Sequence, residues 1–195
     1  MSLSPTKYEI LSAMLLLDKP ERAAHIAKEV GKEFPSVIMH IIGLTRIGYA
    51  TSPEKGLYTL TKKGKKALGI PEVNGENAKA ILADLSQDKS FHFYAGLGKP
   101  LSLRACGLQD FCNKIPKVSS ESIDFHMSRG DFTSWFTSLG DIELAKKVEL
   151  LKRRKIVGEN LRMTLQKIVT NRCMELANMA GSAVSSEQLN TNLGV

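Results

Sequence analysis

Four side chains in the middle of this 195-residue chain could do acid–base or metal chemistry, namely His92, His126, Arg129 and Asp131. A histidine beside a carboxylate can transfer a proton or hold a metal ion. Each of the four also has a simpler use, because both histidines adjoin phenylalanines and Asp131 stands where a helix N-cap is expected. No carboxylate pair, nucleophile motif or metal-ligand spacing accompanies them. We therefore predict no catalytic residue, no metal site and no cofactor, and an enzyme site around the two histidines is the alternative.

A second set of residues could bind phosphate. Thr61 can cap a helix, and four cations follow it directly: Lys62, Lys63, Lys65 and Lys66. Cations at the positive end of a helix dipole repel that end unless an external anion faces them. This helix start is therefore predicted to contact a polyanion.

The lysine cluster follows a predicted β-hairpin. Residues 44–47 close an amphipathic helix that Gly48 can end, since glycine accepts the left-handed cap conformation. Residues 49–52 and 57–60 have the composition of strands, and residues 53–56 form a polar turn. One helix, a hairpin and the lysine-bearing helix thus follow one another without a break.

The residues around the end of this hairpin carry a resemblance to a known family. Leu60, Thr61 and Gly64 reproduce a "Leu-Thr-x-x-Gly" signature. With the preceding helix and hairpin, the segment resembles the winged helix-turn-helix domains of prokaryotic transcription regulators, over about the first third of the chain. The resemblance implies a third helix in the DNA major groove and a two-stranded wing against the backbone or minor groove.

The expected third helix, residues 35–47, is unusual for a helix that reads bases. Of its outward positions only Arg46 is permanently cationic, whereas base readout usually draws on Arg, Lys, Asn or Gln. Its apolar Ile38 and Ile42 also suit a winged helix that contacts protein instead. The expected DNA-binding residues are Lys32, Ser36, His40, Arg46, Lys55, Lys62, Lys63, Lys65 and Lys66.

The net charge of +7 is unevenly divided. Residues 1–70 hold 11 Lys and Arg against 6 Asp and Glu, and residues 71–195 hold 16 against 14. The basic excess coincides with the winged-helix segment, which favours double-stranded DNA as its partner.

Composition indicates a globular protein, because 43% hydrophobic residues suffice for real cores. No apolar run is as long as a membrane span, and the N-terminus has no secretory pattern, so no membrane association and a cytoplasmic location are expected. Cys106, Cys112 and Cys173 match no zinc motif and are expected to be free, largely buried thiols.

Helix and turn signals divide the chain into four segments. We predict a winged helix-turn-helix domain over residues 1–70, a linker with a short helix over 71–89, a mainly helical α+β domain over 90–180 and a flexible tail over 181–195. The fold class is thus mainly α with small β-hairpins. Expected helices cover residues 5–17, 21–30, 77–85, 107–115, 119 or 120 to 130, 132–139, 142–155 and 159–179, and the second hairpin pairs 91–95 with 101–105.

The second domain carries its own resemblance. Its aromatic and charged residues are similar to the pattern of an uncharacterised domain found mainly in archaeal proteins, over residues 90–174. The residues concerned are Phe91, Phe93, Tyr94, Phe125, His126, Arg129, Gly130, Asp131, Phe132 and Trp135. That family has no assigned activity, so the resemblance implies no chemistry.

Two patterns in the last helices have two interpretations each. The cations of residues 146–155 could bind nucleic acid, but Leu144, Val148 and Leu151 make them the solvated face of an amphipathic helix. An apolar seam in the last helix, interrupted by Arg172, closes the domain's own core or joins a second subunit. The seam consists of Leu161, Leu165, Ile168, Leu176 and Met179.

From the sequence we expect the chain to be a DNA-binding transcription regulator, and a homodimer because operators have two half-sites. Its second domain would serve for dimerisation or for binding a ligand or protein partner. The alternative is a protein-interaction adaptor whose winged helix does not bind DNA.

Overall fold

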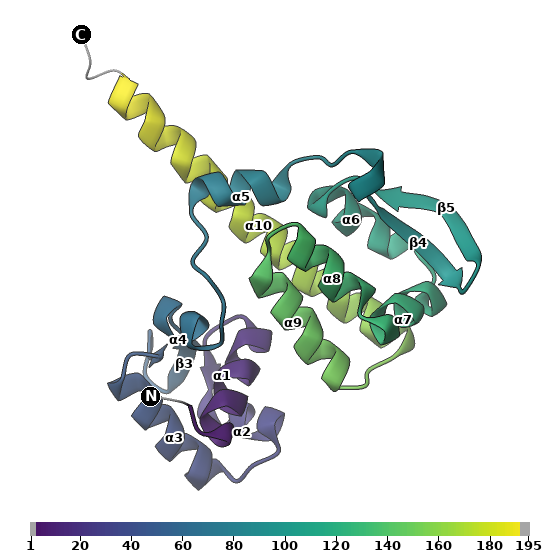
Figure 1. The fold of residues 1–195 in the computed structure, drawn as a ribbon. Helices are drawn as coiled ribbons and strands as arrows, with labels where there is room; N and C mark the ends of the chain where they lie inside the picture. Colours follow the sequence, from purple (N-terminus) through teal and green to yellow (C-terminus); the bar gives the residue numbers. More distant parts are fainter. Residues whose placement is uncertain (1–2, 192–195) are drawn as a thin grey trace. The chain divides into compact units, whose positions relative to one another are not determined.

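The computed structural model describes residues 3–191, with side chains for residues 3–181, in two compact units, residues 1–72 and 73–195 (Figure 1). The described chain is mainly helical, with one three-stranded and one two-stranded antiparallel sheet. The predicted fold class, mainly α with small hairpins, is confirmed.

The first unit places a small sheet beside four helices. Its elements are α1 (Pro5–Leu17), β1 (Glu21–Arg22), α2 (Ala23–Val30), α3 (Phe34–Arg46), β2 (Ala50–Thr51), β3 (Leu57–Leu60) and α4 (Lys62–Ala67). Strand β3 lies between β1 and β2. The hairpin predicted after the third helix is therefore present, with Thr51 opposite Thr59.

The start of α2 differs from the prediction. Glu21 and Arg22 were expected in the helix, but they form β1 and pair with Tyr58 and Leu57 of β3. The Glu21 carboxylate accepts a hydrogen bond from the Arg22 backbone N–H at 3.0 Å, which helps to hold this short strand. Pairing with a distant strand thus replaces the first helical turn.

The hairpin and α4 are joined through Thr61 and Gly64. The Thr61 hydroxyl donates to the Gly48 carbonyl at 2.7 Å and accepts from the Gly64 N–H at 3.0 Å. A Cβ on Gly64 would lie 2.1 Å from the Tyr49 carbonyl oxygen, so only glycine allows this close approach. The signature residues therefore have a structural reason to be present.

The second unit packs helices around a hairpin and along one long helix. Its elements are α5 (Gly75–Leu82), η1 (Gln87–Lys89), β4 (Phe91–Gly96), β5 (Lys99–Ala105), α6 (Leu108–Lys114), η2 (Ile115–Lys117), α7 (Ser120–Arg129), α8 (Asp131–Ser138), α9 (Ile142–Arg153) and α10 (Gly158–Thr191). Helix α5, expected in a linker, lies against α10 with Ala78 and Ile81 buried, so it belongs to this unit.

Helix α10 is longer than predicted and its seam is covered within the unit. The helix continues to Thr191 instead of ending near Met179, and residues 192–195 of the expected tail lie outside the described residues. Leu161, Leu165 and Leu176 are each at most 1% exposed, because α5, α6, α7 and α9 pack on α10. The unit's own core therefore accounts for the seam.

An aromatic cluster fills the space between the β4–β5 hairpin and helices α6 to α8. The ring of Phe91 lies 5.0 Å from that of Phe93, 5.5 Å from that of Phe111 and 5.2 Å from that of Phe132. The Trp135 ring is 5.3 Å from Phe91, and its indole N–H donates to the Lys89 carbonyl at 3.0 Å. Such contacts fix the rings in one arrangement.

The three cysteines are free, as predicted, with Cys112 and Cys173 buried and Cys106 partly exposed. Burial raises the pKa of the Cys173 thiol to about 12. Across the part of the chain that the structure describes, no helix combines the length and apolar character needed to cross a membrane.

Candidate functional site

The outward face of α3 is more apolar than a base-reading helix requires. Phe34 is 48% exposed and Met39 is 67% exposed, and both are next to or near the expected contact residues. Ser36 and Arg46 are exposed and His40 is partly exposed, so these three side chains are accessible on one helix. Only Arg46 adds a charge to this face.

Two lysines of the α4 cluster are held by the unit itself. Lys62 forms an ion pair with Glu72, and this hydrogen bond lowers the pKa of the Glu72 carboxyl. Lys63 donates to the Ile47 carbonyl at 2.8 Å and lies 5.4 Å from the Tyr49 ring centroid. Glu72 thus supplies an anion for Lys62, whereas Lys63 is held by a carbonyl oxygen and an aromatic ring.

The remaining predicted cations differ in how they are engaged. Lys32 pairs with Glu9 at 3.1 Å, and Lys65 is partly buried. Arg46, Lys55 and Lys66 are exposed, and they form no ion pair with any described residue. These last three are the cations best able to meet an external phosphate.

The charge of unit 1 is concentrated in α3, the β2–β3 hairpin and α4. Residues 34–70 hold six Lys and Arg against one acidic residue, Glu54, whereas residues 3–33 hold five of each sign. The entire excess of the unit thus lies in the part of the chain that follows α2. A polyanion would be attracted to these elements more than to α1 and α2.

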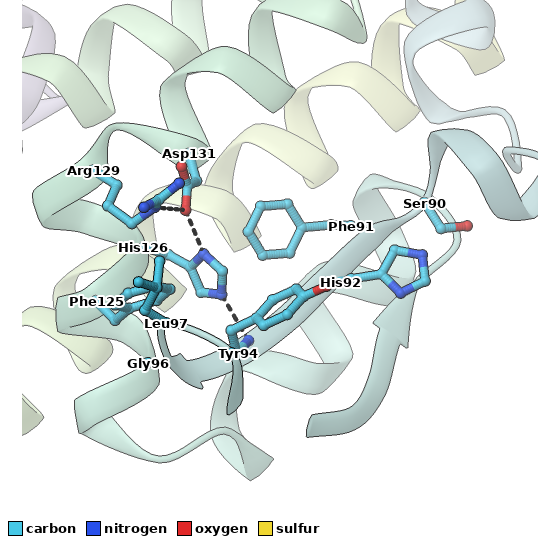
Figure 2. A pocket seen from close by; sticks show the side chains of 11 residues that line it. Ser90, Phe91, His92, Tyr94, Gly96, Leu97, Phe125, His126, Arg129 and Asp131 are labelled. Carbon is cyan, nitrogen blue, oxygen red and sulfur yellow. Dashed lines mark hydrogen bonds and ion pairs between the residues drawn. The ribbon is translucent and has the colours of Figure 1, made fainter. Parts of the chain in front are cut away.

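A second candidate site lies in unit 2, where His126 is 3% exposed and both of its ring nitrogens are engaged. Nε2 accepts from the Tyr94 N–H at 2.9 Å, so Nδ1 must carry the proton that it donates to Asp131 Oδ2 at 2.8 Å (Figure 2). Burial lowers the pKa of His126, and this outweighs the opposing effect of Asp131. A neutral histidine with no free lone pair is unsuited to act as a general base.

Asp131 was predicted to cap the helix that follows it, and this is wrong. Gly130 occupies the N-cap position, and Asp131 is the first residue of α8. The Asp131 carboxylate instead receives His126 Nδ1 and, at 3.1 Å, Arg129 Nε. Two side-chain donors from α7 take the oxygen that a helix cap would use.

Most of the residues that carry the second resemblance meet at this place. Phe91 and Tyr94 from β4 and Phe125, His126 and Arg129 from α7 line one cavity. His92 lines the same cavity but is exposed, with Nε2 3.4 Å from the Gln87 carbonyl oxygen. Within residues 3–181, no group of three or more His, Cys, Asp or Glu could hold a metal ion.

Sequence reasoning missed a buried charge cluster in unit 2. Arg172 of α10 donates to Asp141 at 2.9 Å and to Glu143 at 3.3 Å, and Lys147 pairs with Glu143 at 3.1 Å. Lys147 is 0% exposed, so it does not belong to the solvated face to which it was assigned. The four-residue spacing from Glu143 to Lys147 and the position of Arg172 inside the seam were the available signals.

Comparisons with protein families, curated proteins and solved structures found no match. The function of the chain is therefore inferred from its own residues and their geometry.

Proposed function

We propose that unit 1 is a winged helix that binds double-stranded DNA and that the protein is a transcription regulator. The observation that carries this proposal is the concentration of cations on α3, the β2–β3 hairpin and α4. The order of these elements is the one that the winged-helix resemblance implies. A regulator of this kind works in the cytoplasm, and that location is part of the proposal.

In this proposal α3 enters the major groove and the hairpin lies along the backbone. Arg46, Lys55 and Lys66 are exposed and contact phosphates. Ser36 and His40 supply the remaining polar contacts from α3. With so few groups able to read base edges, phosphate contacts provide most of the affinity, and sequence preference is modest.

The test is a salt series of duplex binding by the whole protein. Each phosphate contact contributes about 0.9 to the slope of log affinity against log salt. The triple variant Arg46→Gln, Lys55→Gln, Lys66→Gln should therefore bind more weakly and lose up to about three units of slope. Unchanged affinity and slope would refute the proposal.

A matched control removes the same number of exposed cations from the end of α9 and the turn that follows it in unit 2. The variant Lys152→Gln, Arg153→Gln, Lys155→Gln changes the net charge equally. It should leave the slope close to that of the parent protein. An equal effect of both triple variants would mean that binding follows net charge and not the winged helix.

A second function, protein contact through α3, is favoured by one observation. Phe34, Met39 and Ile47 are 43–67% exposed, and a groove of about 490 Å³ lies beside the helix. Phe34 and Ile38 line this groove together with Leu57 and Tyr58 of β3. Exposed apolar side chains of this kind are frequent at protein interfaces. Met39→Ser would weaken such an interface and leave phosphate contacts intact.

A homodimer remains part of the DNA-binding proposal, because two winged helices would meet two half-sites. The surface that joins the subunits cannot be the seam of Leu165 and Ile168, since both are buried inside unit 2. Among residues 158–181 of α10, the large apolar side chains that are exposed are Met163 and Met174. Light scattering of the whole protein at micromolar concentration tests the dimer directly.

A further inference from the structure

The cavity beside His126 has the size and wall chemistry of a small-molecule site. Its volume is about 270 Å³, just below the range of about 300–1,000 Å³ that is typical of ligand pockets. Figure 2 shows the rings of Phe91, Tyr94 and Phe125 around it, with Arg129 beside Asp131 at one side. A pocket of this size accepts a single-ring compound but no dinucleotide or peptide.

Arg129 brings an oriented positive charge to this apolar cavity. Its Nε donates to Asp131 at 3.1 Å, and its guanidinium carbon lies 5.2 Å from the Phe125 ring centroid. Asp131 therefore holds one edge of the guanidinium, and the aromatic ring supports one face. The terminal Nη1 and Nη2 groups make no hydrogen bond to any described residue, and the side chain is 51% exposed.

Two terminal N–H donors in one plane match the two oxygens of a carboxylate. Asp131 leaves these two donors open, because it accepts from Nε of Arg129 and from Nδ1 of His126. His126 adds no charge of its own, since burial lowers its pKa. The cavity thus contains one open cationic fork next to aromatic walls.

The exposure of Leu97 is a second observation that favours a ligand at this cavity. It lines the cavity from the β4–β5 turn and is 84% exposed, the highest exposure among the large apolar side chains described. A ligand in the cavity would cover part of this side chain and remove apolar surface from water.

We propose that the cavity binds a small aromatic carboxylic acid, whose ring lies against Phe91 and Phe125 and whose carboxylate pairs with Arg129. Benzoate and phenylacetate are the simplest members of this class. The role of unit 2 is then recognition and not catalysis, because the lone pair of His126 is already used by the Tyr94 N–H. This proposal does not depend on DNA binding by unit 1.

The experiment titrates the whole protein with benzoate and phenylacetate and, as uncharged counterparts, with benzamide and phenylacetamide. Trp135 is the only tryptophan and lies 5.3 Å from the Phe91 ring, so its fluorescence reports on the cavity wall. Calorimetry gives the affinities independently. A charge-assisted pair favours the acids over the amides by about tenfold or more.

Two variants assign the binding to this cavity. Arg129→Gln should bring the affinity for each acid within about twofold of the affinity for its amide. Arg153 is an exposed arginine of α9, and Arg153→Gln should leave the preference for acids unchanged. Leu97 lies in an exposed turn, so Leu97→Ser should weaken the binding of acids and amides alike without affecting folding.

Three outcomes would overturn the proposal. They are no binding of either acid at millimolar concentration, equal affinity for acid and amide in the parent protein, and acid binding that is unaffected by both Arg129→Gln and Leu97→Ser. The titrations contain no DNA. If the acids do not bind, the proposal of DNA binding is therefore unaffected. If the salt series shows no DNA binding by unit 1, the proposal of acid binding is likewise unaffected.

Discussion

Asp141→Asn should strongly destabilise unit 2, because Asp141 is the centre of its buried charge cluster. The residue is 0% exposed and accepts from Arg172 Nε with both carboxylate oxygens, at 2.9 and 3.1 Å. It also caps α9 by accepting from the Leu144 N–H at 3.1 Å. Burial lowers the pKa of Arg172, but the hydrogen bond and charge of Asp141 outweigh this, so the pKa is raised.

The expected loss of unfolding free energy follows from these contacts. Removing one partner of a buried ion pair costs about 3–5 kcal/mol. Asparagine keeps an acceptor for the Leu144 N–H, and Arg172 retains Glu143 at 3.3 Å and Glu175 at 2.6 Å. We therefore expect about 3 kcal/mol for Asp141→Asn, at the lower end of that range. Asp141→Ala should lose about 1 kcal/mol more, because the cap is also removed.

Urea denaturation followed by Trp135 fluorescence measures this effect, since the single tryptophan lies in unit 2 and is 8% exposed. With a denaturant dependence of about 1–3 kcal/mol/M, the midpoint should fall by about 1 M or more. Glu149→Gln is the control on the same helix, where a partly exposed carboxylate pairs with Lys146 and Arg153. It should lose at most about 1 kcal/mol. Equal losses for Asp141→Asn and Glu149→Gln would refute the assignment of a stabilising buried cluster.

Two further predictions concern other parts of the chain. Gly64→Ala should destabilise unit 1 by at least about 2 kcal/mol, because the added Cβ would meet the Tyr49 carbonyl oxygen. At Gly43 an added Cβ would meet open space, so Gly43→Ala should stabilise α3 by about 0.5–1 kcal/mol. Hydrogen exchange of unit 1 amides measures both, and equal effects would contradict the close approach at Gly64. His126 should be mainly in its neutral Nδ1–H tautomer at about pH 6.5, where a free histidine is half protonated, and nitrogen NMR shifts would show this. The stability of unit 2 should fall as the pH drops below about 6.5. Stability falls in this pH range because His126 takes up a proton in the unfolded chain but stays neutral in the folded one. Titration of His126 near pH 6.5 in the folded protein would contradict this prediction.

The sequence by itself determined the local features of this protein. Ser4, Ser119 and Asp141 cap helices at or next to the predicted helix starts, and Gly130 and Gly140 follow helix ends in the left-handed conformation. Each of these features depends on hydrogen bonds or backbone angles within about four residues, so the sequence contains both partners. The same locality made the β2–β3 hairpin and the β4–β5 hairpin predictable.

The tertiary structure alone decided which charges are buried and which are free. Asp131 could have capped α8, but His126 and Arg129 take its carboxylate. Lys147 was expected on a solvated helix face, but packing against α9 buries it beside Glu143. In the same way, Lys62 was expected to contact phosphate, but it forms an ion pair with Glu72. These outcomes depend on partners that are brought together only by packing, and burial then fixes whether a charge must be paired inside the chain or remains open to a ligand.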